Sequence, residues 1–200
     1  MSWDERYAGD EYRFGTEPNA FLVSCLPLLV PGGRALCVAD GEGRNGVWVA
    51  AQGMAVDAFD PSAVAVAKAD RLAALRGVEV ATVVADADTF VWPEGAYDVV
   101  AAIFIQFADP ALRRRIFARS ARALLPGGVL LVEGYGPRQL AYATGGPRTL
   151  DHLYTEEQLR EELEAVGLRI ERLASYDAIV EEGPGHSGLS ALVDAVARRG

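Results

Sequence analysis

The stretch Asp40-Gly41-Glu42-Gly43-Arg44-Asn45-Gly46 decides the fold that we expect for this chain. It follows an apolar run over residues 35–39, which is typical of a buried strand, and it opens a helical pattern over residues 44–52. Glycine has no Cβ, so the backbone of such a turn can approach a ligand closely. The spacing also fits G-x-G-x-x-G, a pattern of dinucleotide-binding folds whose specificity is low when it stands alone.

The charge of this loop points to a different kind of ligand. Asp40 and Glu42 place two carboxylates in the turn. They would repel a pyrophosphate, whereas they would attract a cationic small molecule. The loop therefore favours a positively charged ligand over a dinucleotide. The alternative is that both acids face solvent and select no ligand.

Strand-like and helix-like segments alternate along the rest of the chain. We expect strands near residues 35–39, 54–59, 78–84, 97–104, 129–133 and 168–177, and helices near 18–29, 44–52, 62–76, 110–124 and 155–166. Nearly continuous apolar strands between helices are typical of a parallel sheet that is covered on both faces. The predicted fold is therefore α/β and doubly wound.

The two ends of the chain are harder to assign. Residues 1–16 alternate aromatic residues with acids and arginines, which does not predict a regular amphipathic helix; this arm is either a lid over a site or a packed tail. Residues 189–198 fit a helix by their alanines, but a final antiparallel strand would complete the sheet. With no long linker or repeat, residues 1–200 are predicted to form a single domain.

Composition limits the classes of partner. The chain has 200 residues, half of them hydrophobic, and a net charge of -9, which argues against a nucleic-acid partner. Cys25 and Cys37 lie in apolar runs and are interpreted as reduced core residues, and with only two histidines we expect no metal site. No secretion signal or span of sufficient length is visible, so we expect a cytoplasmic protein without a membrane partner.

The ends of the predicted strands carry further candidate residues. In parallel α/β sheets, ligands bind beyond the carboxyl ends of the strands. Asp60, followed by Pro61, could accept hydrogen bonds from two ribose hydroxyls, or it could be a helix cap. Asp86, with the backbone of Ala87, could contact an adenine ring, or it could be a turn residue. Phe104 ends the fourth predicted strand and is expected beside the same ligand.

Several motifs taken together resemble a known family. They are Trp3-Asp4-x-Arg6-Tyr7, Phe14-Gly15-Thr16-Glu17-Pro18-Asn19, Asp40-Gly41-Glu42-Gly43-Arg44-Asn45, Asp60, Leu124-Leu125-Pro126-Gly127-Gly128 and Thr144-Gly145-Gly146-Pro147. The chain resembles the class I S-adenosylmethionine (SAM)-dependent methyltransferases, and more narrowly the small bacterial group of tellurite-resistance and thiopurine-type enzymes. It departs from the class where Cys37 replaces the usual acid and Ala39 replaces the first glycine of the loop.

This resemblance implies a mostly parallel seven-stranded sheet of the Rossmann-like methyltransferase fold and SAM as the cofactor. SAM carries a sulfonium and an ammonium, so the acidic loop agrees with it. The expected cofactor-binding residues are Asp40, Gly41, Glu42, Gly43, Arg44, Asn45, Asp60, Pro61, Asp86, Ala87 and Phe104. Asp40 or Glu42 would contact the ammonium in place of the missing acid.

The predicted reaction is methyl transfer to a small molecule. His186, in a glycine-rich loop, is the candidate general base for an acceptor that arrives protonated, because its ordinary pKa is about 6.5; the alternative is a surface histidine. Residues that could line the acceptor pocket are Arg6, Tyr7, Gln106, Glu133, Tyr135 and Tyr142. The resemblance suggests a thiol or a tellurium or selenium oxyanion as acceptor. An NAD(P)-dependent dehydrogenase and a SAM-binding protein without turnover are the alternatives, and the oligomeric state is left open.

Overall fold

The computed structural model describes residues 2–142 and 144–200, which are built around one seven-stranded sheet of order β3-β2-β1-β4-β5-β7-β6. Strands β1 to β5 run parallel, and β7 is antiparallel to both of its neighbours, β5 and β6. The ambiguous C-terminal segment is therefore a strand. The bounds are Arg34–Val38 (β1), Ala55–Asp60 (β2), Ala81–Val84 (β3), Tyr97–Ile103 (β4), Leu124–Tyr135 (β5), Leu168–Glu181 (β6) and Ser187–Arg199 (β7).

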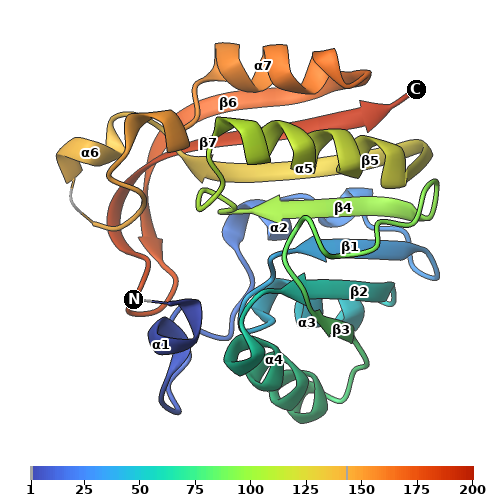
Figure 1. Cartoon of the computed structure of the whole chain (residues 1–200), viewed down its shortest axis with the longest axis vertical. Helices are drawn as coiled ribbons and strands as arrows, with labels where there is room; N and C mark the ends of the chain where they lie inside the picture. Colours follow the sequence, from blue (N-terminus) through green and yellow to red (C-terminus); the bar gives the residue numbers. More distant parts are fainter. Residues whose placement is uncertain (1, 143) are drawn as a thin grey trace.

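Helices cover both faces of this sheet (Figure 1). One apolar core joins the sheet to α5 (Pro110–Ala123) and α7 (Glu156–Ala165), and a second core joins it to α2 (Ala20–Ser24) and α3 (Arg44–Ala51). Cys25 and Cys37 are buried and free in the second core. The remaining helices are α1 (Trp3–Tyr7), α4 (Ala63–Arg76), α6 (Gln139–Tyr142) and the short 3-10 turns η1 (Leu26–Leu28) and η2 (Leu150–His152). The predicted doubly wound, mostly parallel fold is confirmed.

Local caps explain where the helices begin. The side chain of Ser62 accepts from the backbone N–H of Ala65 at 3.1 Å, and α4 ends at Gly77, whose φ of 68° is left-handed. Asp109 accepts from Leu112 at 2.7 Å at the start of α5, and Thr155 accepts from Gln158 at 3.2 Å at the start of α7. Each such cap typically stabilises a protein by about 1 kcal/mol.

The arm differs from its prediction. Residues 3–7 form the short helix α1, because Ser2 and Glu5 cap each other reciprocally and Trp3 stacks on Tyr7 with ring centroids 5.6 Å apart. The arm as a whole is not a regular amphipathic helix, as expected, but this short helix within it was not predicted. The predicted helix over 18–29 was also too long: it breaks after α2 into η1, which contains Pro27 and therefore lacks one backbone donor.

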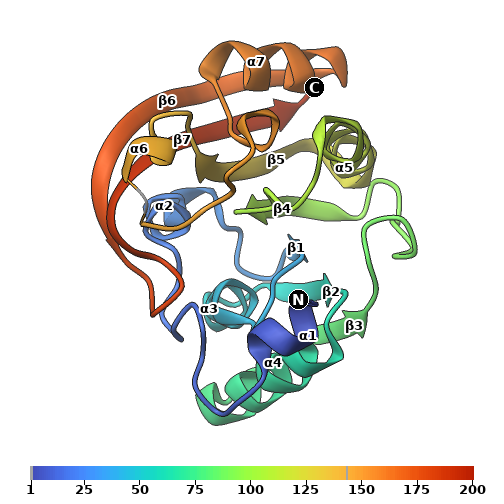
Figure 2. The same ribbon diagram turned by 60° about the vertical axis from the view of Figure 1, so that its left-hand side comes forward.

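The long β6–β7 hairpin extends beyond the rest of the sheet and bends toward the arm (Figure 2). At its tip, the N–H of Gly185 donates to the carbonyl of Arg13 at 2.8 Å. A Cβ on Gly183 would lie 2.4 Å from the backbone nitrogen of Gly15, so only glycine permits this approach. Arm and hairpin therefore meet on the side of the sheet where β1, β2 and β4 end.

Candidate active site

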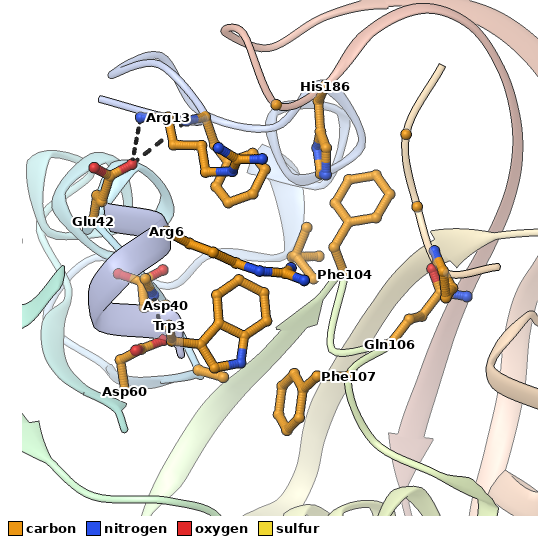
Figure 3. Close-up of a pocket in the computed structure, with 18 of the residues that line it drawn as sticks. Trp3, Arg6, Arg13, Asp40, Glu42, Asp60, Phe104, Gln106, Phe107 and His186 are labelled. Atoms are coloured by element: carbon orange, nitrogen blue, oxygen red, sulfur yellow. Dashed lines mark hydrogen bonds between the residues drawn. The ribbon is translucent and has the colours of Figure 1, made fainter. Parts of the chain in front are cut away.

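A cavity of about 670 Å³ lies at the carboxyl ends of β1, β2 and β4. It is lined by the loop after β1, the end of β2, Phe104, α1, the arm and the hairpin tip. Figure 3 shows Asp40 and Asp60 on one side of this space and Phe107 and Gln106 across from them, with the side chain of Arg6 reaching between. The parallel sheet thus provides the floor, and segments distant in sequence provide the walls.

Asp60 occupies the end of β2 and is 5% exposed. Its Oδ2 accepts from the N–H of Gly41 at 3.0 Å, and its Oδ1 accepts from the N–H of Ser62 at 2.9 Å. Burial raises the pKa of Asp60 to about 6 in spite of these hydrogen bonds. Gly41 has a φ of 59°, and a Cβ there would lie 2.9 Å from the hydroxyl oxygen of Tyr7, so the turn needs glycine.

Asp40 lies two residues after the end of β1, and its side chain contacts the first turn of α3. Both of its carboxylate oxygens accept from the N–H of Gly46, at 3.2 and 3.1 Å. Burial raises the pKa of Asp40 to about 7, and the nearby carboxylate of Asp60 adds to this. Among the described residues, neither acid forms an ion pair, so a bound cation would supply the missing counter-charge.

Glu42 lines the same cavity, but its charge is already balanced. Its Oε1 lies 2.7 Å from Nζ of Lys68, and its Oε2 accepts from the N–H of Arg13 at 2.7 Å. Glu42 therefore anchors the arm (Figure 3). The charge argument drawn from the sequence for this loop then depends on Asp40 rather than on Glu42.

Other residues in and beside this loop set the backbone turn and the packing of the neighbouring helices. Ala39 adopts the left-handed φ of 50° that a glycine would take in the family pattern. Gly43 lies outside the cavity lining; a Cβ there would lie 2.6 Å from that of Ala69, so it lets α3 and α4 pack closely. Oδ1 of Asn45 accepts from the N–H of Asn19 at 2.9 Å, which joins the loop to α2.

Aromatic rings surround His186, which is 8% exposed. The ring centroids of Phe14 and Phe104 both lie 4.5 Å from that of His186, and that of Tyr135 lies 5.5 Å away. Phe104 itself has a φ of 54°, an uncommon conformation for a bulky residue that costs energy and often marks a ligand site. The imidazole of His186 points into the cavity (Figure 3). It is a buried residue, not the surface histidine of the alternative interpretation.

Cationic side chains line the part of the cavity formed by the arm and by residues 145–149. Arg6, Arg13 and Arg148 all line it, and within residues 2–142 and 144–200 none of them pairs with a carboxylate. The guanidinium of Arg6 lies 4.7 Å from the ring centroid of Trp3 and extends toward Phe104 (Figure 3). These arginines are solvated, and they are available to an anionic ligand.

Several predicted site residues lie elsewhere. Asp86 is exposed, and its Oδ1 accepts from the N–H groups of Asp88 and Thr89, so it caps a turn; Ala87 is buried beside it. Glu133 is buried and accepts a hydrogen bond from Asn19 away from the cavity lining. Tyr142 donates to Asp177 at 3.1 Å and also lies outside the lining.

Gln106, by contrast, lines the cavity as predicted. Its side-chain amide forms hydrogen bonds with the backbone of Tyr135 and His152.

The structure also adds lining residues that sequence reasoning did not assign. Trp3 and Phe14 of the arm line the cavity, as does His152, whose Nδ1 lies 2.9 Å from the carbonyl oxygen of Gln106. The alternation of aromatic and charged residues in the arm was the available signal for Trp3 and Phe14. Nothing in the local sequence around His152 indicates that η2 passes this cavity.

Known proteins similar to this chain point to the same family as the sequence motifs. Residues 35–128 match the family model described as "Methyltransferase domain". This part of the chain is similar to methyltransferase domains. This match supports the predicted enzyme class, a SAM-dependent methyltransferase. No curated protein matches the sequence.

Solved structures agree on the fold. One, from work on the conversion of a disulfide bond into a thioacetal group during echinomycin biosynthesis, has 21% identity and a TM-score of 0.79 and covers 98% of this chain and 87% of its own. TehB from Haemophilus influenzae has 15% identity and a TM-score of 0.73, over 91% and 62% of the two chains. Magnesium protoporphyrin IX methyltransferase from Synechocystis PCC 6803, solved with bound SAM, has 19% identity and a TM-score of 0.64, over 90% and 76%.

The residues that line the cavity fit SAM. The buried carboxylate of Asp60 and the half-buried carboxylate of Asp40 line the cavity without an ion-pair partner among the described residues, and the glycine turn lets the backbone come close to a ligand. No helix within the described part of the chain is both long and apolar enough to cross a membrane.

Proposed function

We propose that this methyltransferase domain transfers the methyl group of SAM to a small, soft acceptor that carries negative charge, such as a thiolate or a tellurium or selenium oxyanion. The observation that carries this proposal is the division of charge in the cavity. Asp40 and Asp60 offer uncompensated acids at the strand ends, and Arg6, Arg13 and Arg148 offer unpaired cations elsewhere in the described lining. One fold neighbour, from work on disulfide conversion, also concerns sulfur.

The residues divide into two groups by role. When bound, SAM supplies an electrophilic methyl group on a positively charged sulfur. We assign the ribose hydroxyls to Asp60 and the ammonium to Asp40, because both carboxylates line the cavity without an ion-pair partner in the described chain. An adenine contact from Asp86 stays a prediction, and it requires this side chain to release the N–H groups that it caps.

Alignment is the main task left to the protein. Holding two reacting groups in a near-attack arrangement can supply roughly 7–11 kcal/mol of the barrier. The walls of Trp3, Phe14, Phe104 and Phe107 exclude water from the acceptor, and the arginines orient its negative charge. For an acceptor that arrives protonated, we assign the proton to His186. Residues 1–200 act in this proposal as one domain, with residues 1–16 as its lid, in the cytoplasm and without nucleic acid.

The experiment combines binding with turnover. Calorimetry with SAM and with NADH tests the cofactor, and detection of S-adenosylhomocysteine tests turnover with an aryl thiol, tellurite and selenite beside an amine of similar size. We expect SAM to bind, NADH not to bind, and the anionic acceptors to be methylated faster than the amine. A preference for the amine would contradict the proposed acceptor class, and NADH binding without SAM binding would contradict the enzyme.

A further inference from the structure

The turn between β6 and β7 holds Glu182 and His186 face to face. The N–H of Glu182 donates to the carbonyl of His186 at 2.7 Å, and the N–H of His186 donates to Gly183 at 3.2 Å. The contact of Gly185 with the carbonyl of Arg13, at 2.8 Å, ties this turn to the arm. The relative position of the two side chains is therefore set by backbone hydrogen bonds.

The carboxylate of Glu182 is fixed from two further sides. Its Oε2 lies 2.6 Å from Nη2 of Arg44, and its Oε1 accepts from Nδ2 of Asn19 at 3.0 Å. The side chains of Glu182 and Arg44 are 11% and 7% exposed, so solvent screens this ion pair little. Burial alone would raise the pKa of Glu182, but His186 and Arg44 outweigh it and lower that pKa to about 2. Glu182 is therefore a permanent anion at neutral pH.

The two nitrogens of the imidazole differ in surroundings. Nδ1 of His186 is buried and has no hydrogen-bond partner among the described residues, and it lies 3.5 Å from Oε2 of Glu182, just beyond a good hydrogen bond. The rings of Phe14, Phe104 and Tyr135 hold the imidazole from the sides. Since Nδ1 faces the carboxylate, Nε2 is the nitrogen that remains for a ligand in the cavity.

We propose that Glu182 is a positioning residue that fixes the imidazole of His186 through Nδ1–H and thereby presents a basic Nε2 to the acceptor. The proposal rests on the proposed function in one respect, the role of His186 as base. It assigns Glu182 two tasks: orienting the base, and joining it through Arg44 to the loop that follows β1.

The proton transfer balances as follows. Nε2 takes the proton of the acceptor X–H, and the electron pair of X forms the bond to the methyl carbon. The electron pair of the broken carbon–sulfur bond stays on sulfur. The products are X–CH3, S-adenosylhomocysteine and an imidazolium, which later loses its proton to water. While His186 is charged, Glu182 stabilises it by a charge-assisted hydrogen bond from Nδ1–H.

The groups facing His186 set its basicity in opposite directions. Burial lowers the pKa of His186, Glu182 raises it, and the guanidinium groups of Arg44 and Arg13 lower it again. From β5, the phenol of Tyr135 contributes a neutral ring, because burial raises its pKa. The imidazole is neutral at pH 7 and can accept a proton.

Nuclear magnetic resonance of the two histidines tests this inference without turnover. A His152→Gln variant assigns the signals, since His152 and His186 are the chain's two histidines. We expect His186 to carry its proton on Nδ1. Glu182→Gln should lower the pKa of His186, Arg44→Gln should raise it, and Glu181→Gln, which changes an exposed neighbour on the same hairpin, should leave it unchanged. Variants that merely loosen the turn would not shift this pKa in opposite directions.

Turnover gives the second readout. With a protonated acceptor, Glu182→Gln should lower kcat roughly 10-fold and move the acid limb of the pH profile to lower pH. A proton on Nε2, or an unchanged pKa in both Glu182→Gln and Arg44→Gln, would overturn the role of Glu182. If Glu182→Gln does not fold, the tautomer of the parent protein and the Arg44→Gln titration still decide. Absence of SAM binding by the parent would instead overturn the proposed function.

Discussion

Nζ of Lys68 lies 2.7 Å from Oε1 of Glu42, and the two side chains are only 1% and 2% exposed. Lys68 also donates to the carbonyl of Glu11 at 2.7 Å, while Glu42 accepts from the N–H of Arg13. One buried ion pair thus holds two points of the arm against α4 and the loop after β1. The position of the arm at the cavity therefore depends on this pair.

We therefore predict that Lys68→Met is strongly destabilising. It leaves Glu42 buried without a counter-charge, which typically costs about 3–5 kcal/mol in the free energy of unfolding. Denaturant unfolding measures this, and faster tryptic cleavage at Arg13 would report release of the arm. The double variant Lys68→Met/Glu42→Gln should recover most of the loss. No recovery would mean that the ion pair is not the source of the effect.

SAM binding should release protons near neutral pH. Asp40 has a pKa of about 7 and Asp60 of about 6, so both carry some proton in the free protein at pH 6–7, and a bound cation favours their ionised forms. The affinity for SAM should then fall as the pH drops from 8 to 5. Calorimetry in buffers of different ionisation enthalpy measures the released protons. Asp40→Asn should release fewer, and Asp177→Asn, at an exposed site, should behave like the parent.

Ala39 carries a backbone cost that glycine would remove. At a φ of 50° the backbone of an L-residue is strained by about 1–2 kcal/mol. Glycine avoids this strain, but it loses more conformational entropy on folding than alanine does, which costs about 0.5–1 kcal/mol. Ala39→Gly should therefore raise the free energy of unfolding by about 0.5–1 kcal/mol in thermal or denaturant unfolding. Ala35→Gly, within the extended strand β1, should lower it. Equal losses at both positions would contradict the strain.

The buried pair of Glu133 and Asp194 predicts a specific dependence of stability on pH. These residues face each other across β5 and β7, and burial raises the pKa of both. The contribution of these two carboxyl groups to the free energy of unfolding is therefore complete below their pKa values in the unfolded chain. It is lost as the pH rises through their pKa values in the folded protein. Glu133→Gln, which does not titrate, should match the stability of the parent below about pH 4 and exceed it at pH 8. A stability difference that is independent of pH would contradict a raised pKa of Glu133.

Arg6 should matter for the acceptor and not for the cofactor. Its guanidinium reaches into the cavity without a carboxylate partner in the described chain. Arg6→Gln should raise the KM of an anionic acceptor roughly 10-fold, because hydrogen bonds to charged groups contribute about 1.5–3 kcal/mol. Kd for SAM should stay the same. The control is Arg138→Gln, since Arg138 pairs with Asp177 outside the cavity lining.

The parts of the fold that depend on local pattern were predictable from sequence. The bounds of α4 follow from the Ser62 cap and Gly77, and the strands from their apolar runs. The C-terminal strand was not decided by its alanines, because its pairing with β5 and β6 is a tertiary effect. Helix α1 was missed, although Ser2 and Glu5 have the spacing of a capping box.

The site was only partly predictable, for a related reason. The acids and glycines at the strand ends could be placed because parallel strands end at one edge of the sheet. Sequence could not show that Lys68 would neutralise Glu42, or that Glu182 would stand beside His186 and Arg44, because these partners come from distant segments. Asp86 illustrates the opposite error, since a turn cap and a ligand contact have the same local sequence.

Lys68 is the only lysine in the chain, and it is covered by the arm. While the arm is in place, amine-directed reagents will therefore find no reactive ε-amino group. Modification of Lys68 requires the arm to lift. The rate of its acylation, followed by mass spectrometry, therefore measures how often the arm moves away from Lys68, and the measurement needs no engineered label.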